Sequence, residues 1–184
     1  MSNQILLWSM LVVPWLSLFF MNKEDLKRYM PVGVLAVATS VIIGDVGSSL
    51  GFWIVRETAY PLYHIMPFNI GLNLALTMWV FKFSYHQFWL YMITNAVLDL
   101  SFNFFLFQFI LSSRGIFHLV NISPFQSFLI TTTHALLLYG YQKWQEGIFM
   151  RSVSPASSQY LQPALAKPLP QDRAENGLKN ENDE

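Results

Sequence analysis

The chain has 184 residues, of which 53% are hydrophobic and only 12% are charged. Ordinary globular domains carry roughly 25% charged residues, so this composition excludes a typical water-soluble domain. The net charge is zero, which argues against electrostatic binding of nucleic acid. The absence of cysteine excludes disulfides, thiolate metal sites and cysteine nucleophiles.

Five apolar stretches are long enough to cross a bilayer. A hydrocarbon core about 30 Å thick needs roughly 20 residues of helix. The first stretch has no basic residue ahead of it and no small-residue cleavage site, so we interpret it as a permanent span and not a signal peptide. We therefore predict an all-α membrane bundle of about five transmembrane helices. The expected spans are residues 5–21, 31–55, 67–83, 88–111 and 125–141.

Basic residues in the short connections predict the orientation of the bundle. Cytoplasmic loops carry an excess of Lys and Arg. If the N-terminus is outside, six basic residues lie inside and two lie outside, which favours an N-outside, C-inside arrangement. The inner residues are Lys23, Lys27, Arg28, Lys82, Lys143 and Arg151, and the outer ones are Arg56 and Arg114.

The character of the sequence changes near residue 151. From there to the end, Pro, Ser, Gln, Asn and charged residues dominate. Such a segment cannot bury enough apolar surface to offset the entropy of ordering it. We therefore expect residues 1–150 to form the transmembrane domain and residues 151–184 to form a disordered cytoplasmic tail.

Three ionisable residues fall inside the predicted spans. Asp45, Asp99 and His134 each lie, on these boundaries, within about one helical turn, roughly 5 Å, of the bilayer midplane. An ionisable group in hydrocarbon is costly, so it marks a functional site by default. Asn95, Asp99 and Asn103 recur every four residues and are expected on one helix face. The candidate proton, ion or substrate site comprises Asp45, Asp99, His134, Asn73, Asn95 and Asn103.

Small residues in the second span predict close helix packing. Gly47 and Gly51 form a G-x-x-x-G pattern, and Gly44 lies one turn earlier. Small residues let helix backbones approach where lipid supplies no hydrophobic drive. We expect Gly44, Gly47 and Gly51 to form a helix-packing face, with spans two to five turning polar stripes inward.

Two interpretations of the polar cluster stay open. In the first, a proton or a cation passes along the ionisable residues and is linked to transport of a small solute. In the second, the polar residues are interhelical hydrogen bonds, worth about 0.6–2 kcal/mol each, in a non-catalytic assembly or scaffold protein. Two acids and a histidine exceed what packing needs, because Asn or Ser holds helices together at a lower desolvation cost.

Catalytic motifs find no support in the sequence. Residues 47–51 resemble a serine-nucleophile turn but lack the G-x-S-x-G spacing, and H-E-x-x-H is absent. We therefore expect no enzymatic activity, no cofactor and no metal. The expected partners are the lipid bilayer and either a second copy or another membrane protein, with no nucleic acid.

Three segments of the chain carry a family resemblance. Residues 7–16, 23–31 and 139–147 resemble an uncharacterised family of small multi-pass membrane proteins from spore-forming Gram-positive bacteria. The similarity runs from the start of the chain to about Gly147 and leaves out the tail. The resemblance implies a multi-pass protein of the bacterial cytoplasmic membrane, and it implies no activity or binding residue.

Overall fold

A computed structural model describes residues 3–63 and 65–152, with side chains as far as residue 147. Its contacts divide the chain into a unit of residues 1–146 and a second of residues 147–184. The packing described below is that of the first unit. All of the predicted tail except its first two residues, which end the last helix, lies outside the described residues.

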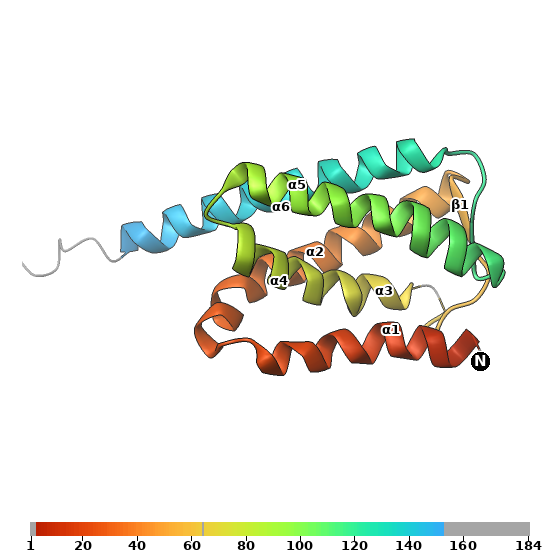
Figure 1. The fold of residues 1–184 in the computed structure, drawn as a ribbon, viewed down its shortest axis with the longest axis horizontal. Coiled ribbons are helices and arrows are strands. Elements are labelled where there is room, and N and C mark those ends of the chain that lie inside the picture. Colours follow the sequence, from red (N-terminus) through yellow and green to blue (C-terminus); the bar gives the residue numbers. More distant parts are fainter. Residues whose placement is uncertain (1–2, 64, 153–184) are drawn as a thin grey trace, which may run out of the picture. The chain divides into compact units, whose positions relative to one another are not determined.

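The described residues are mostly helical, which confirms the all-α expectation in its coarse form. Figure 1 shows that the helices of the first unit run back and forth in successive passes. Three helical segments, Asn3–Phe20, Lys23–Ser49 and Phe88–Leu111, are long and apolar enough to cross a membrane. The helices are α1 (Asn3–Ser17), the 3-10 helix η1 (Leu18–Phe20), α2 (Lys23–Ser49), α3 (Pro67–Ile70), α4 (Leu72–Ser84), α5 (Phe88–Leu100), the π-helix η2 (Ser101–Leu111) and α6 (Pro124–Ser152).

A small antiparallel sheet contains residues that were expected to end the second span. Strand β1 (Trp53–Val55) pairs with β2 (Phe117–Leu119), with Ile54 opposite His118. Helix α2 therefore ends at Ser49 and does not reach Val55 as expected.

Gly51 explains why α2 ends where it does. Its φ of 72° is the left-handed conformation that glycine adopts without a Cβ penalty. The amide of Gly51 donates to the Ser48 carbonyl, and the amide of Phe52 donates to the Gly47 carbonyl. This pair of bonds is the Schellman arrangement that satisfies the last carbonyls of a helix. The chain then reverses into β1.

Helix α2 packs extensively against α4. Ala36 of α2 is fully buried, and a Cβ on Gly33 would lie only 3.0 Å from the Met78 side chain. The Asn73 amide donates across this contact to the Ala36 carbonyl at 3.2 Å. Small residues on α2 leave its backbone accessible to side chains of the neighbouring helix.

The three glycines predicted as a helix-packing face have different roles. Gly44 lies against Asn69 of α3, as a helix contact requires. Gly47 instead lies against the indole ring of Trp53 in the returning strand, and Gly51 forms the turn. The G-x-x-x-G pattern therefore supports a chain reversal and not a contact between two helices.

Two hydrophobic clusters hold the unit together. One lies among α2, α4, α5 and α6 and includes Phe81, Tyr85 and Tyr91. The other joins α1 to the sheet and η2 and includes Trp53 and Phe107.

Gly47→Ala tests the reversal after α2. The added methyl group would overlap the Trp53 ring, so we expect a loss of about 1–3 kcal/mol in the free energy of unfolding. The matched control is Gly140→Ala in α6, where a Cβ meets nothing within 4 Å, and this change should be neutral or stabilising by up to about 1 kcal/mol. Denaturant unfolding in detergent measures both. Equal effects would contradict the Gly47–Trp53 contact.

Candidate functional site

A cavity of about 410 Å³ lies among the helices, and five of the six candidate residues line it. Its walls come from α2, α3–α4, α5–η2 and α6, with β1, β2 and the connection that precedes α3 at one end. None of the described residues of α1 contributes to its lining. The five candidate residues are Asp45, Asn73, Asn95, Asp99 and His134.

Asp45 is the most accessible of the ionisable groups in the cavity. Its side chain is exposed and makes no hydrogen bond or ion pair with any described residue. Because α2 ends at Ser49, Asp45 lies one turn from the end of its helix and not near the middle of a longer span. The expectation that all three ionisable residues share one depth is therefore corrected for Asp45.

Asp99 and His134 lie deeper and have hydroxyl partners. The Thr132 hydroxyl donates to Asp99 Oδ2 at 3.3 Å. His134 Nε2 lies 2.6 Å from the Thr39 hydroxyl, a hydrogen bond whose direction depends on the imidazole tautomer. Both residues are partly buried. Each interaction joins α6 to another helix, so both residues have a packing role as well as a place in the cavity.

These contacts arrange the three groups in sequence along the cavity. His134 is level with Thr39, and Asp45 lies six residues further along α2, about 9 Å nearer the sheet. Asp99 is level with Thr132, two residues before His134 in α6 and about 3 Å nearer the sheet. The order from the sheet inward is therefore Asp45, Asp99 and His134.

Neutral polar groups complete the lining. The side-chain nitrogens of Asn73 and Asn95 donate to the backbone carbonyls of Ala36 and Tyr91, so one of the two N–H donors of each amide is engaged. Thr77 and Ser127 also line the cavity; they are 9% and 6% exposed, and their hydroxyls make no hydrogen bond with any described residue. These two hydroxyls lie on the polar stripes of their helices, but spacing alone did not distinguish them from packing residues.

Asn103 does not line the cavity. It is fully buried, and its amide donates to the Asp99 carbonyl at 2.8 Å and to the Thr131 hydroxyl at 3.4 Å. The four-residue spacing placed it with Asn95 and Asp99, but the helix becomes a π-helix from Ser101. A π-helix bonds each residue to the fifth along, which changes the register of the side chains beyond Ser101. The Asn103 side chain faces the contact with Thr131 of α6.

The cavity is not arranged as a metal cage. Within the described part of the chain, no group of three His, Asp or Glu side chains lies close enough to hold a metal ion. Asp45, Asp99 and His134 therefore share a cavity without converging on one point.

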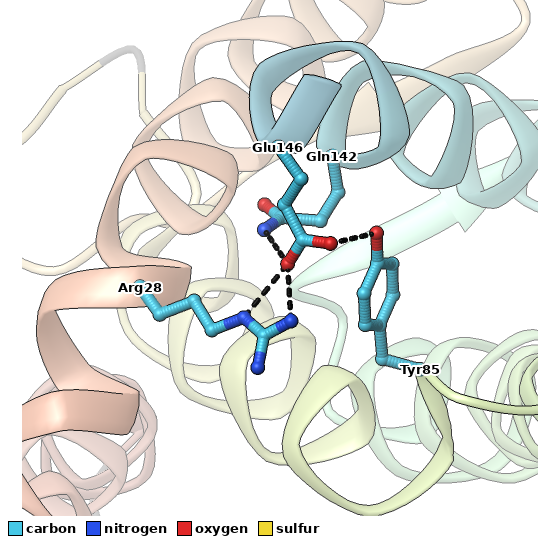
Figure 2. A network of polar contacts seen from close by, with 4 residues as sticks. All are labelled: Arg28, Tyr85, Gln142 and Glu146. Carbon is cyan, nitrogen blue, oxygen red and sulfur yellow. Dashed lines mark hydrogen bonds and ion pairs between the residues drawn. The ribbon is translucent and has the colours of Figure 1, made fainter. Parts of the chain in front are cut away.

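A second polar cluster lies at the other end of the unit and centres on Glu146 of α6 (Figure 2). Arg28 Nε of α2 and the Tyr85 hydroxyl each donate to the carboxylate at 2.7 Å, and the Gln142 amide donates at 3.4 Å. We refer to Arg28, Tyr85, Gln142 and Glu146 as the Glu146 cluster. Because Arg28 and Glu146 are 118 positions apart, no local spacing in the sequence indicated it.

The electrostatics of this cluster favour the ionised carboxylate. Burial raises the pKa of Glu146, but hydrogen bonds from Tyr85, Arg28 and Gln142 outweigh it and hold that pKa below its ordinary value. Burial and the hydrogen bond to Glu146 raise the pKa of Tyr85, so its phenol stays protonated as a donor. The Arg28 guanidinium also lies 5.5 Å from the centre of the Tyr85 ring.

Aromatic packing separates the cavity from the Glu146 cluster. The rings of Phe81 and Tyr91 are 4.9 Å apart, and those of Tyr91 and Tyr139 are 5.0 Å apart. At the opposite end, the cavity reaches Tyr63 and Ile54, which are 69% and 46% exposed. The cavity is therefore approached from the sheet end and blocked at the Glu146 end.

Comparisons of the chain with protein-family models, with curated proteins and with solved structures find no match. The family resemblance in the sequence stays a prediction, and the functional argument depends on the geometry of the cavity.

The lowered pKa of Glu146 predicts a pH-dependent stability. Since its folded-state pKa lies below the ordinary value of 4.5, the stabilisation is complete above that pH and is lost as pH falls through the folded-state pKa. Thermal unfolding between pH 7 and pH 3 should show a smaller acid-induced decrease for Glu146→Gln than for the unaltered chain. The control Glu24→Gln changes an exposed carboxylate and should leave the pH profile unaltered. Identical profiles for all three proteins would contradict the prediction.

Proposed function

We propose that the chain spans the bilayer five times, with its N-terminus outside, and that its cavity carries a small solute across in a step linked to a proton or a cation. The passes are α1–η1, α2, α3–α4, α5–η2 and α6. Three of these passes are long and apolar enough to span a membrane. Residues 67–84 add a path of about 27 Å, which matches a hydrocarbon core of about 30 Å.

The distribution of charge supports the proposed orientation. Basic side chains gather at the Glu146 end. Arg28 and Lys143 lie over the Tyr85 ring, and Lys82 pairs with Asp25. Arg56 and Glu57 lie at the sheet end, where Asn3 of α1 donates to the Glu57 carboxylate at 2.7 Å. The end that is richer in basic residues is the cytoplasmic one under the positive-inside rule.

The observation that carries the transport proposal is that Asp45, Asp99 and His134 line one cavity. Asp45 is exposed and has no hydrogen-bond or ion-pair partner among the described residues, so helix packing does not account for it. Ionisable residues that face a cavity inside a membrane mark substrate, ion and proton pathways. This arrangement favours passage over assembly.

The order of the three groups suggests how a charge moves. A proton or cation that enters from the sheet end meets Asp45 first, then Asp99, and finally His134 with its Thr39 partner. The buried hydroxyls of Thr77 and Ser127 supply further oxygens in the same cavity. Onward movement requires the aromatic rings and the Glu146 cluster to separate, which is the alternating access of a transporter.

Reporter fusions test the orientation. A fluorescent protein fused after Glu146 should fluoresce, and alkaline phosphatase fused at the same point should be inactive, because this end lies in the cytoplasm. Fusions after Arg114 should give the opposite pair of signals, since the connection between η2 and α6 lies outside. Active phosphatase after Glu146 would overturn the orientation.

Asp99→Asn tests the passage itself. We expect proteoliposomes of the purified chain to take up protons under a potassium diffusion potential, measured with an entrapped pH dye, at least ten times faster than vesicles with the Asp99→Asn variant. The amide keeps the size and the Thr132 hydrogen bond of Asp99 but removes its charge. Glu24→Gln, outside the cavity, should retain the flux.

The unfolding temperature of each variant separates loss of flux from loss of fold. If the unaltered chain carries no more protons than empty vesicles do, the passage fails and the polar residues become packing contacts of an assembly protein.

A further inference from the structure

We infer that the cavity binds a small protonated amine, an ammonium head group carried on an apolar body. This inference rests on the proposed function in taking the cavity as a solute site, and it adds the chemical class of the solute. Binding can be measured without transport, so the two proposals can fail separately.

The first argument is the sign of the charge. Asp45 and Asp99 are both acids, and among the described residues that line the cavity no Lys or Arg occurs. Arg28 and Lys143 belong to the opposite end of the unit, and Arg56, which follows the lining residue Val55 at the sheet end, is not itself part of the lining. An anion in the cavity would meet carboxylates and no positive partner, whereas a cation would gain a charge-assisted hydrogen bond.

The second argument is the sense of the hydrogen bonds. Asn73 and Asn95 each use one amide N–H on a backbone carbonyl, which leaves one N–H and one carbonyl oxygen on each side chain. Asp45 adds two carboxylate oxygens without a partner among the described residues, and the hydroxyls of Thr77 and Ser127, which are unpaired there, add two lone pairs for each O–H. The cavity therefore offers more acceptors than donors. A protonated primary amine is complementary because it brings three donors and no acceptor.

The third argument is the apolar remainder of the lining. The volume of about 410 Å³ falls in the range of roughly 300–1,000 Å³ typical of small-molecule sites. Aromatic rings attract cations at their faces and accommodate hydrocarbon elsewhere. An amine with a hydrocarbon body uses this surface, whereas a hydrated metal ion does not. The aromatic residues of the lining are Trp53, Tyr63, Phe68, Phe102, Phe107 and Phe117.

Asp99 is the better anchor for the ammonium group. It is partly buried and held by the Thr132 hydroxyl, and its carboxylate oxygens keep lone pairs that can accept from the ligand. Asp45 is exposed near the sheet and lies where an entering cation meets the cavity first. Loss of the Asp99 charge should therefore reduce affinity more than loss of the Asp45 charge.

Calorimetric titration of the full chain in phosphatidylcholine nanodiscs at pH 7 tests the inference. The probes are 2-phenylethylamine, 2-phenylethanol and phenylacetate, which share an aromatic body and carry a cationic, a neutral and an anionic head group. Empty nanodiscs correct for partition into lipid. The variants are Asp99→Asn, Asp99→Glu, Asp45→Asn and the control Glu24→Gln.

We expect the amine to bind at least tenfold more tightly than the alcohol, and phenylacetate not to bind. Asp99→Asn should weaken amine binding at least tenfold, while Asp99→Glu and Glu24→Gln retain it.

If Asp99→Asn does not fold, Asp45→Asn at its exposed position must lower the affinity for the amine by a measurable factor. Equal binding of amine and alcohol, or amine affinity unchanged in the folded variants that lack a carboxylate, would overturn the inference. Amine binding without proton flux would contradict the transport proposal and leave the amine site standing. Asp99-dependent proton flux without amine binding would contradict the amine site and leave the transport proposal standing.

Discussion

The close approach of α2 to α3–α4 is the constraint on which the rest of the unit depends. Asn69 and Asn73 donate to the backbone carbonyls of Ser40 and Ala36, at 3.5 Å and 3.2 Å. A side chain reaches the backbone of a neighbouring helix only where that helix carries small residues, and Gly33 extends the same face of α2. This packing fixes the position of α2 along the axis of the bundle. It thereby sets Thr39 level with His134 and Asp45 near the sheet.

The cavity follows from where the helices are joined. At one end, the Glu146 cluster and the aromatic rings around Tyr85 tie α2, α4 and α6 together. At the other end, the sheet closes the chain reversals after α2 and η2. Between these ends the helices present short polar side chains, which do not fill the space that Phe or Leu would occupy. The same residues that make the interior polar therefore also leave it hollow.

Helical periodicity in the sequence predicted part of this site and missed the rest for identifiable reasons. Asn95, Asp99 and His134 line the cavity because their helices are regular at those positions. Asn103 was expected in the cavity, but its amide is buried in bonds to the Asp99 carbonyl and the Thr131 hydroxyl, and the sequence indicates neither these bonds nor the π-helix that begins at Ser101. The Glu146 cluster joins residues far apart in the chain, and such a pairing depends on tertiary packing that periodicity does not encode. Five membrane spans and their orientation stay predictions.

The two ends of the cavity differ in a way that bears on the proposed transport. The sheet end presents exposed side chains such as Tyr63, whereas the Glu146 end is held by hydrogen bonds to an ionised carboxylate. Bonds of that kind contribute about 1.5–3 kcal/mol each, so opening this end is costly unless another interaction compensates. A ligand shifts such an equilibrium only by its difference in affinity for the two states. Under the proposed transport, a cation bound beside Asp99 must therefore interact more favourably with an inward-open state than with the arrangement described here. The rings of Phe81, Tyr91 and Tyr139 lie between the cavity and the Glu146 cluster, so the proposal requires these rings to repack.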